Sequence, residues 1–287
     1  MTQEPLKNLL PVFIKHLEEK GRSPSTILAY RADLEQMIKV LQDKNKVTLE
    51  GVVQSDIEAF RDSLLNEKYT AKSVSRKLNA VKTFFRWLIN EKLASSNPSE
   101  NVSHPKIATS LPKFLSSLEY RALRDVVRDD LRLAAIIELI LQTGTRISEV
   151  ASLKTANLKD DLIKIEPYAT QPAREIPLNK SAKDAIDKYI SIRPQTSSEY
   201  VFVSKNGKAL AVRNMRAAID RFLQKAEISQ YSVNDLRTTF IVENLKAGVD
   251  LVLLSKVAGH KRLSTTERYL ELAGVKESGK KQALIEL

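Results

Sequence analysis

The chain has 287 residues, of which 43% are hydrophobic and 28% charged, a composition typical of soluble globular proteins with two ordinary domains. It contains no cysteine, which excludes disulfides and thiolate metal sites, and no apolar stretch reaches the roughly 18 residues of a membrane span. The net charge of +11 points to a polyanionic partner, because an excess of basic residues is the usual footprint of nucleic-acid binding. No signal peptide is recognisable at the N-terminus, and we expect a protein of a prokaryotic cytoplasm, associated with the nucleoid.

The first third of the chain carries apolar residues at helical spacing in four stretches. They predict helices over residues 5–20, 25–41, 55–65 and 70–93. The second follows a turn at residues 21–24, with Ser23 or Ser25 as its N-cap. Short connections between amphipathic helices predict a helical bundle.

A polar segment follows the bundle. Residues 95–114 hold three prolines and many serine, threonine and asparagine residues, without sustained periodicity. We therefore assign residues 1–100 to a first domain, 101–113 to a linker and 114–287 to a second domain with a C-terminal tail.

The second domain is predicted to be mainly helical with a small β-sheet. Alternating residues in 161–166 and 174–178 flank a proline-containing turn and predict a hairpin. Residues 200–210 resemble a strand and a turn at Asn206-Gly207. Helices are predicted over residues 118–127, 131–142, 212–226, 234–247, 250–258 and 263–272.

Three polar segments interrupt this apolar pattern. The first, Thr143-Gly-Thr-Arg-Ile-Ser-Glu-Val150, carries Arg146 and Glu149; the second, Asn234-Asp-Leu-Arg-Thr-Thr-Phe240, carries Arg237; the third, from Val257 to Leu270, carries His260 and Tyr269. Singly, each has an ordinary explanation, such as a structural arginine–glutamate pair or a half-buried tyrosine.

The order and spacing of the three segments resemble those of the tyrosine recombinases, the family of the phage integrases, Xer recombinases and transposon-encoded recombinases. The resemblance extends over nearly the whole chain, since the runs Gly21–Leu34 and Lys77–Leu88 resemble the family's core-binding domain. It implies an N-terminal SAM-like helical bundle and an α-rich catalytic domain.

The resemblance also implies a mechanism. Tyr269 would attack a DNA phosphodiester and form a 3′-phosphotyrosine, which conserves the bond energy so that no ATP or other cofactor is needed. Arg146 and Arg237 would clamp the non-bridging oxygens and replace a metal ion, His260 would bind the same phosphate, and Glu149 would orient the site.

The sequence departs from the family pattern at two positions. Asn234 stands where the family has histidine or lysine, which leaves the base that accepts the tyrosine proton unassigned. The turn of the hairpin, residues 167–173, lacks the lysine that protonates the leaving 5′-oxygen, and Lys164 on the strand is the nearest substitute. An exposed strand residue is the alternative interpretation of Lys164.

Basic residues of the first domain are candidates for DNA contacts. Arg76 and Lys77 on the fourth predicted helix are expected to read base edges, with further contacts from Lys72, Lys82, Arg86, Arg22 and Tyr30. The expected partner is double-stranded DNA with a specific core site, bound by a homotetramer on two such sites. The apolar tail after Gly279 is expected to dock on a neighbouring protomer, with docking on its own domain as the alternative.

The predicted function is site-specific DNA recombination by integration, excision or resolution. Two alternatives remain: a DNA-binding accessory protein with a weakened active site, and a monomeric nicking–closing enzyme similar to type IB topoisomerases. The sequence specifies neither the target DNA, nor the biological setting, nor any accessory protein.

Overall fold

The structure is a computed structural model that describes residues 4–108, 111–167, 172–276 and 279–287. It consists of two compact units, Met1–Thr109 and Ser110–Leu287, each with its own hydrophobic core. The division between them falls inside the segment 101–113 that the sequence assigns to a linker.

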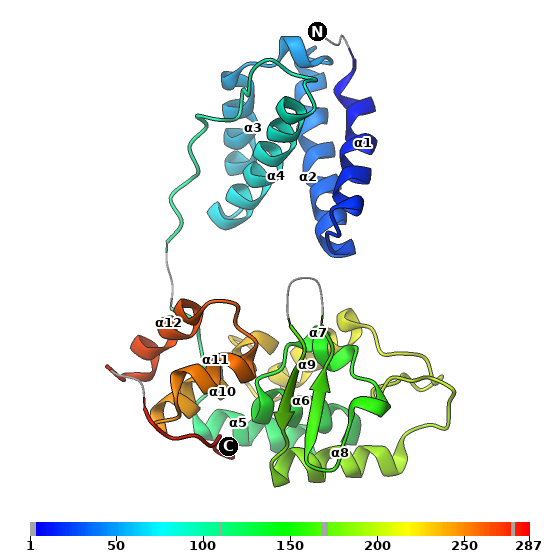
Figure 1. Cartoon of the computed structure of the whole chain (residues 1–287), viewed down its shortest axis with the longest axis vertical. Helices are drawn as coiled ribbons and strands as arrows, with labels where there is room; N and C mark the ends of the chain where they lie inside the picture. Colours follow the sequence, from blue (N-terminus) through cyan, green and yellow to red (C-terminus); the bar gives the residue numbers. More distant parts are fainter. Residues whose placement is uncertain (1–3, 109–110, 168–171, 277–278) are drawn as a thin grey trace. The chain divides into compact units, whose positions relative to one another are not determined.

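The first unit is a bundle of the four helices that the apolar spacing predicts (Figure 1). Its core is rich in aromatic side chains, with Phe13, Phe60, Phe84 and Phe85 fully buried. The hydroxyl of Ser23, one of the two predicted caps, accepts the backbone N–H of Thr26 at 3.2 Å. The helices are α1 (Leu6–Glu19), α2 (Pro24–Asp43), α3 (Gln54–Asn66) and α4 (Ala71–Asn90), with the short 3-10 turn η1 (Leu49–Gly51) before α3.

One buried carboxylate joins α2 to α4. Asp33, only 2% exposed, accepts hydrogen bonds from both terminal nitrogens of Arg76 and from Lys77 Nζ, the last at 2.9 Å. Lys77 also donates to Gln36 Oε1 at 2.8 Å. A DNA contact of Lys77 stays a prediction, although in this structure Lys77 lies on the helix face that Val74 and Leu78 turn to the core, and its ammonium group is held inside the unit.

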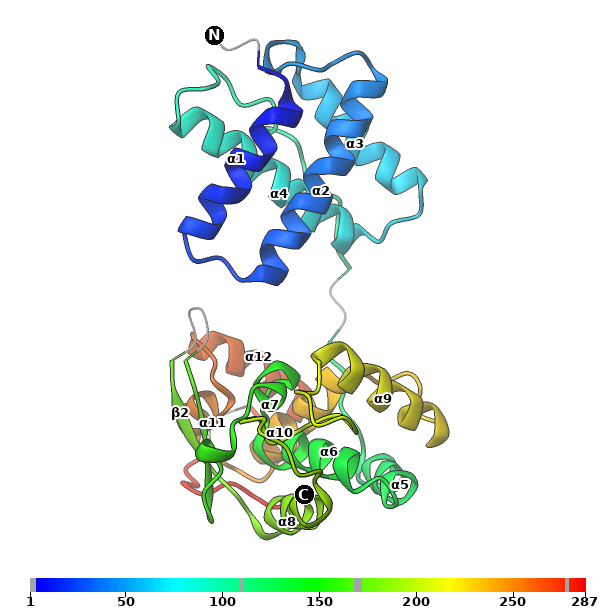
Figure 2. The same cartoon turned by 90° about the vertical axis from the view of Figure 1, so that its right-hand side faces the viewer.

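The second unit is built around α6 (Leu131–Thr143), a nearly all-apolar helix that contacts α5, α8, α9 and α10 (Figure 2). The predicted mainly helical fold with a small sheet is confirmed. The other helices of this unit are α5 (Ser117–Val127), α7 (Ile147–Ala151), α8 (Lys180–Ile192), α9 (Val212–Lys225), α10 (Val233–Lys246), α11 (Leu251–Ala258) and α12 (Leu263–Ala273), with the 3-10 turn η2 (Thr155–Asn157).

The predicted hairpin is present as an antiparallel pair, β1 (Leu162–Ile165) and β2 (Arg174–Pro177). Ile163 pairs with Ile176 and Ile165 with Arg174, so these four side chains share one face, whereas Lys164 and Glu175 share the other. The strand predicted over residues 200–210 is wrong, because the structure has only isolated bridges there, at Tyr200, Val203 and Ala209. Helix α8 was not predicted, although Asn179 caps it and Ala182, Ile186 and Tyr189 bury one face.

The described part of the tail packs on its own unit, so the structure has the second of the two predicted arrangements. Lys281 pairs with Val249 in parallel, the backbone N–H of Ile285 donates to Asn244 Oδ1 at 3.0 Å, and that of Leu287 donates to Gln142 Oε1 at 3.0 Å. Leu284 and Leu287 pack against the core of the unit.

We expect Asp33→Asn to lower the free energy of unfolding of the first unit by about 3 kcal/mol, because it leaves the buried Lys77 ammonium without its counter-charge. Denaturant titration followed by Trp87 fluorescence measures the change. The matched control is Asp62→Asn, since Asp62 forms an exposed pair with Arg61 and its loss costs less than about 1 kcal/mol. Equal effects of the two changes would contradict the assignment.

Candidate active site

Arg146 is fixed by the turn between α6 and α7. Helix α6 ends at Gly144, which adopts a left-handed conformation with φ 62°, and Arg146 is the N-cap of α7. A side chain at Gly144 would collide with the Phe240 ring, since an added Cβ would lie 2.3 Å from it. Glu149 Oε2 accepts the backbone N–H of Arg146 at 2.8 Å, and Glu149 Oε1 accepts Arg146 Nη1 at 3.0 Å.

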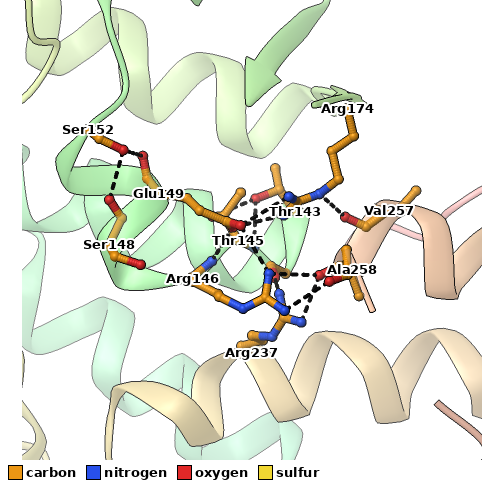
Figure 3. A network of polar contacts seen from close by, with 12 residues as sticks. Thr143, Thr145, Arg146, Ser148, Glu149, Ser152, Arg174, Arg237, Val257 and Ala258 are labelled. Atoms are coloured by element: carbon orange, nitrogen blue, oxygen red, sulfur yellow. Dashed lines mark hydrogen bonds and ion pairs between the residues drawn. The ribbon is translucent and has the colours of Figure 1, made fainter. Parts of the chain in front are cut away.

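Arg237 reaches the same place from α10. Its Nη1 donates to the carbonyl oxygen of Gly144, and its Nη2 donates to that of Ala258 at 2.7 Å. Arg146 Nη2 donates to the next carbonyl, that of Gly259, at 2.9 Å. Two predicted site residues that are 91 positions apart in the sequence therefore meet at the C-terminal end of α11 (Figure 3).

A third guanidinium, from Arg174 on β2, completes the cluster, and the sequence analysis did not identify it. Arg174 donates to both carboxylate oxygens of Glu149, at 3.0 and 2.8 Å, and to the carbonyl of Val257 at 2.8 Å. The position of Arg174 in the strand could have identified it. By alternation it falls on the face of Ile163, Ile165 and Ile176, where a charged side chain needs a partner.

Among the residues that the structure describes, Glu149 is the one carboxylate that pairs with this cluster, through Arg146 and Arg174, and its charge also acts on Arg237. Burial raises the pKa of Glu149, but hydrogen bonds from Arg174 and from the Arg146 backbone outweigh burial and hold this pKa below its usual value. Glu149 is therefore ionised at neutral pH. Three cations against one anion leave an excess of two positive charges in a partly desolvated site.

His260 and Tyr269 lie next to this excess charge. Helix α11 ends at Gly259, with φ 65°, and His260 follows it. The Nδ1 atom of His260 is 2.7 Å from Thr266 Oγ1, and its ring is stacked on that of Tyr269 at 6.1 Å and 6°. Burial, with repulsion from Arg237, Arg146 and Arg174, lowers the pKa of His260 to about 4, so the imidazole is neutral at pH 7.

The guanidinium groups keep donors for a ligand. Among the described residues, neither Arg146 nor Arg237 uses its Nε–H in a hydrogen bond. Burial, together with repulsion from Arg146, lowers the pKa of Arg237 to about 10, which shows the unfavourable proximity of like charges. A tetrahedral oxyanion with two or more oxygens satisfies these requirements, because guanidinium forks match such oxygens.

A cleft of about 400 Å³ adjoins Arg146 on the side of α7 and β1. It is lined by Arg146, Ser148, Glu149, Ser152, Glu166 and Tyr200, together with the segment 209–212. The cluster of guanidiniums thus opens into a space that can hold part of a substrate.

The two positions that depart from the family pattern do not join the cluster. Asn234 is exposed and lies one turn before Arg237 on α10, and its side chain makes no hydrogen bond to the described residues. Lys164 is exposed on the face of β1 opposite that of Arg174, so the structure does not bring it to the guanidiniums. Residues 168–171 of the lysine-free turn lie outside the described residues.

The other DNA-binding candidates of the first unit differ in their surroundings. Lys72, Arg86 and Arg22 are exposed, and Tyr30 is half-buried. Lys82 donates to the carbonyl of Glu100 at 3.2 Å. The side chain of Arg76 is 53% exposed although it is held by Asp33, so it keeps a surface that can meet a ligand.

Two features are absent from the described parts of the chain, a metal-binding cluster and a membrane-spanning helix. No group of three or more histidine, aspartate or glutamate side chains there is placed to hold a metal ion. None of the described helices combines the length and the apolar character required to span a bilayer.

The chain is similar to known proteins over both units. A model of the phage integrase family matches residues 113–274, and a model of the phage integrase N-terminal SAM-like domain matches residues 10–92. Tyrosine recombinase XerC of Roseiflexus castenholzii is 30% identical over 274 residues, which cover 91% of this chain and 87% of the relative.

Two solved structures of lambda integrase share the fold. A dimer bound to a COC′ core site has a TM-score of 0.77 at 18% identity and covers 98% of this chain and 81% of that chain. A tetramer bound to a Holliday junction has a TM-score of 0.74 at 19% identity and covers 90% of this chain and 78% of that chain.

We expect His260 to titrate near pH 4 in the folded chain and near pH 6.5 in the unfolded chain. The unfolded chain then binds a proton that the folded chain does not, so stability is lost as the pH falls from 6.5 towards 4. NMR titration of labelled histidines measures the pKa, and His260→Gln should flatten the acid dependence of unfolding. The same change at His16, in the first unit, is the matched control. A measured His260 pKa above 6 would contradict the lowering of this pKa by burial and by the nearby arginines.

Proposed function

The chain belongs to the phage integrase family and is a tyrosine-type site-specific DNA recombinase, and from this premise we propose that Tyr269 cleaves DNA at a phosphate held by Arg146, Arg237 and His260. The observation that carries the proposal is the excess of two positive charges around Glu149, beside a phenol stacked on a neutral imidazole. The 3′-phosphotyrosine product conserves the energy of the broken bond for rejoining.

Arg146 and Arg237 bind the two non-bridging oxygens of the scissile phosphate. Both groups are held in place before the substrate arrives, by carbonyls of Gly144, Ala258 and Gly259. Fixed cations need no reorganisation when negative charge builds up on those oxygens in the transition state, which is why such groups contribute strongly to rate. Glu149 and Arg174 act as positioning residues, because they touch Arg146 and the end of α11.

His260 serves as hydrogen-bonding partner and proton acceptor at the same phosphate. A phosphate bound among the arginines offsets the repulsion that depresses the pKa of His260. The proton of Tyr269 then passes to the imidazole while the phenolic oxygen bonds to phosphorus. Asn234 can donate a hydrogen bond to the phosphate, but it cannot accept this proton.

The substrate that we propose is double-stranded DNA with a specific core site, cut by a homotetramer on two such sites. The net charge of +11 and the solved lambda integrase complexes support this assignment. In the first unit, Arg76, Lys72, Arg86, Arg22, Lys82 and Tyr30 remain the proposed DNA contacts. We place the reaction at the nucleoid of a bacterial cytoplasm, since the relatives found are bacterial.

The two alternative functions are not favoured. The homologue covering 91% of the chain is a tyrosine recombinase, not a topoisomerase. The guanidinium groups of Arg146 and Arg237 lie close to the imidazole of His260. A protein that only binds DNA does not need these groups together with Tyr269.

We expect a covalent protein–DNA adduct with a nicked suicide duplex, carrying a site first selected from a random pool by binding to the full-length protein. The adduct should resist detergent, form in excess EDTA and be absent with Tyr269→Phe. Gel electrophoresis of labelled DNA measures it. Specific binding by the wild-type protein without any adduct would support the accessory role instead.

Arg237→Ala should lower the rate of adduct formation by about 10²–10³-fold, because one donor to the developing charge is lost. Binding should change within about tenfold, since most backbone contacts lie elsewhere. Arg237→Lys keeps the charge but loses the fork, and should remain strongly impaired. Arg216→Ala, an exposed arginine of α9, is the control. Parallel losses of binding and cleavage in Arg237→Lys would contradict the assigned role.

A further inference from the structure

The reaction assigned to Tyr269 requires a proton for the leaving oxygen. When the phosphorus–O5′ bond breaks, its electron pair leaves on an alkoxide, whose conjugate alcohol is about as weak an acid as water. A positioned acid is therefore needed at neutral pH. The residues already assigned do not supply it, because the guanidiniums hold the non-bridging oxygens and His260 is neutral.

In-line displacement indicates where this acid must lie. The attacking and leaving oxygens stand on opposite sides of phosphorus. Tyr269 approaches from the side of His260, with α12. Arg146 contacts the end of α11, on the side from which Tyr269 approaches, and it also lines the cleft beside α7 and β1. We infer that the leaving oxygen, which stands opposite the Tyr269 oxygen, points into this cleft.

Lys154 is not part of the cleft lining, but its ammonium group lies next to residues that are. Its Nζ lies 4.0 Å from Glu166 Oε2 and 3.2 Å from Glu199 Oε2, and Glu166 and the neighbouring Tyr200 both line the cleft. The backbone around Lys154 is fixed, because Val201 N–H donates to the Leu153 carbonyl and Thr155 N–H donates to the Glu199 carbonyl, both at 2.8 Å. Lys154 also lies beside the end of β1, where the hairpin turn begins.

The partners of Lys154 keep it charged without holding it firmly. The hydrogen bond that Lys154 donates to Glu199 and the charge of Glu166 raise the pKa of Lys154, so it carries a proton at pH 7. Both glutamate side chains are more than half exposed. Exposed pairs of this kind contribute little to stability, so an entering DNA backbone can take over the ammonium.

The geometry points to Lys154 as the general acid for the leaving 5′-oxygen, an inference that rests on the proposed function. As the Tyr269 oxygen bonds to phosphorus, the phosphorus–O5′ bond breaks and a proton moves from Lys154 Nζ to O5′. The products are a 5′-hydroxyl, a phosphotyrosine, a neutral amine at Lys154 and a protonated His260, which holds the proton lost by Tyr269. On rejoining, the amine takes the proton back from the attacking hydroxyl, and O5′ displaces the tyrosine oxygen, which recovers its proton from His260.

Two other groups near the cleft are weaker candidates. Lys164 lies on the face of β1 opposite that of Arg174, and among the described residues it forms no ion pair with a residue that lines the cleft, unlike Lys154. Tyr200 lines the cleft, but as a neutral phenol it would have to donate its proton without an electrostatic attraction to the phosphate. A cation is drawn to the leaving oxygen by the negative charge that builds up there.

The test compares ordinary suicide DNA with the same DNA carrying sulfur in place of O5′ at the cleaved bond. A thiolate leaves without a proton, since thiols have a pKa of about 8.5. We expect Lys154→Ala to slow adduct formation on ordinary DNA by about 10²–10⁴-fold and to cut the sulfur substrate at nearly the wild-type rate. Arg146→Ala should stay slow on both substrates, because its role is unrelated to the leaving group.

Lys164→Ala and Tyr200→Phe are the matched controls and should retain the wild-type ratio of the two rates. Equal slowing of Lys154→Ala on both substrates would show a structural role and overturn the inference, as would an unchanged rate on ordinary DNA. A selective sulfur rescue of Lys164→Ala or Tyr200→Phe would transfer the role to that residue. If the wild-type protein forms no adduct with either substrate, the proposed function itself fails.

Discussion

The contact of one buried carboxylate, Glu149, with the guanidinium groups of Arg146 and Arg174 is the interaction on which the geometry of the site depends. Glu149 alone would not hold Arg146, Arg174 and Arg237, because a single negative charge cannot compensate three positive ones. The carbonyls of Val257, Ala258 and Gly259 complete the arrangement, since they are the unpaired acceptors at the end of α11. The negative end of the helix dipole adds to this attraction. The excess charge that remains is available to an anion.

Two glycines make this close approach geometrically possible. Gly144 turns the chain from α6 into α7 against the ring of Phe240, and Gly259 turns it from α11 towards His260. A Cβ at Gly259 would lie 2.8 Å from the guanidinium carbon of Arg174. Both positions also have positive φ, which side chains other than glycine rarely adopt without strain. Local backbone chemistry therefore fixes the distance between cations that come from remote parts of the chain.

The sequence predicts those parts of the fold and site that depend on local patterns. Most helices were predicted because their apolar spacing is regular, and Arg146 with Glu149 could be paired because they stand three residues apart at a helix start. Arg174 was missed because its partner lies on another element, and a single alternating strand does not reveal that partner. The burial of Lys77 was not foreseen for a related reason, because only the packing of α2 on α4 brings Asp33 beneath it. The segment 200–210 was misread because its apolar run is buried by packing rather than by pairing in a sheet.

The excess positive charge links substrate binding to chemistry. In the free protein the arginines repel protons from His260, so the imidazole is a poor base. In the proposed reaction, a phosphate that enters between Arg146 and Arg237 would neutralise part of their field, and the same event would raise the basicity of the imidazole that takes the proton of Tyr269. The substrate thus supplies the charge that completes the site. In this proposal, His260 becomes an effective base only when a phosphodiester is bound. This would restrict the attack of Tyr269 to DNA held in the site.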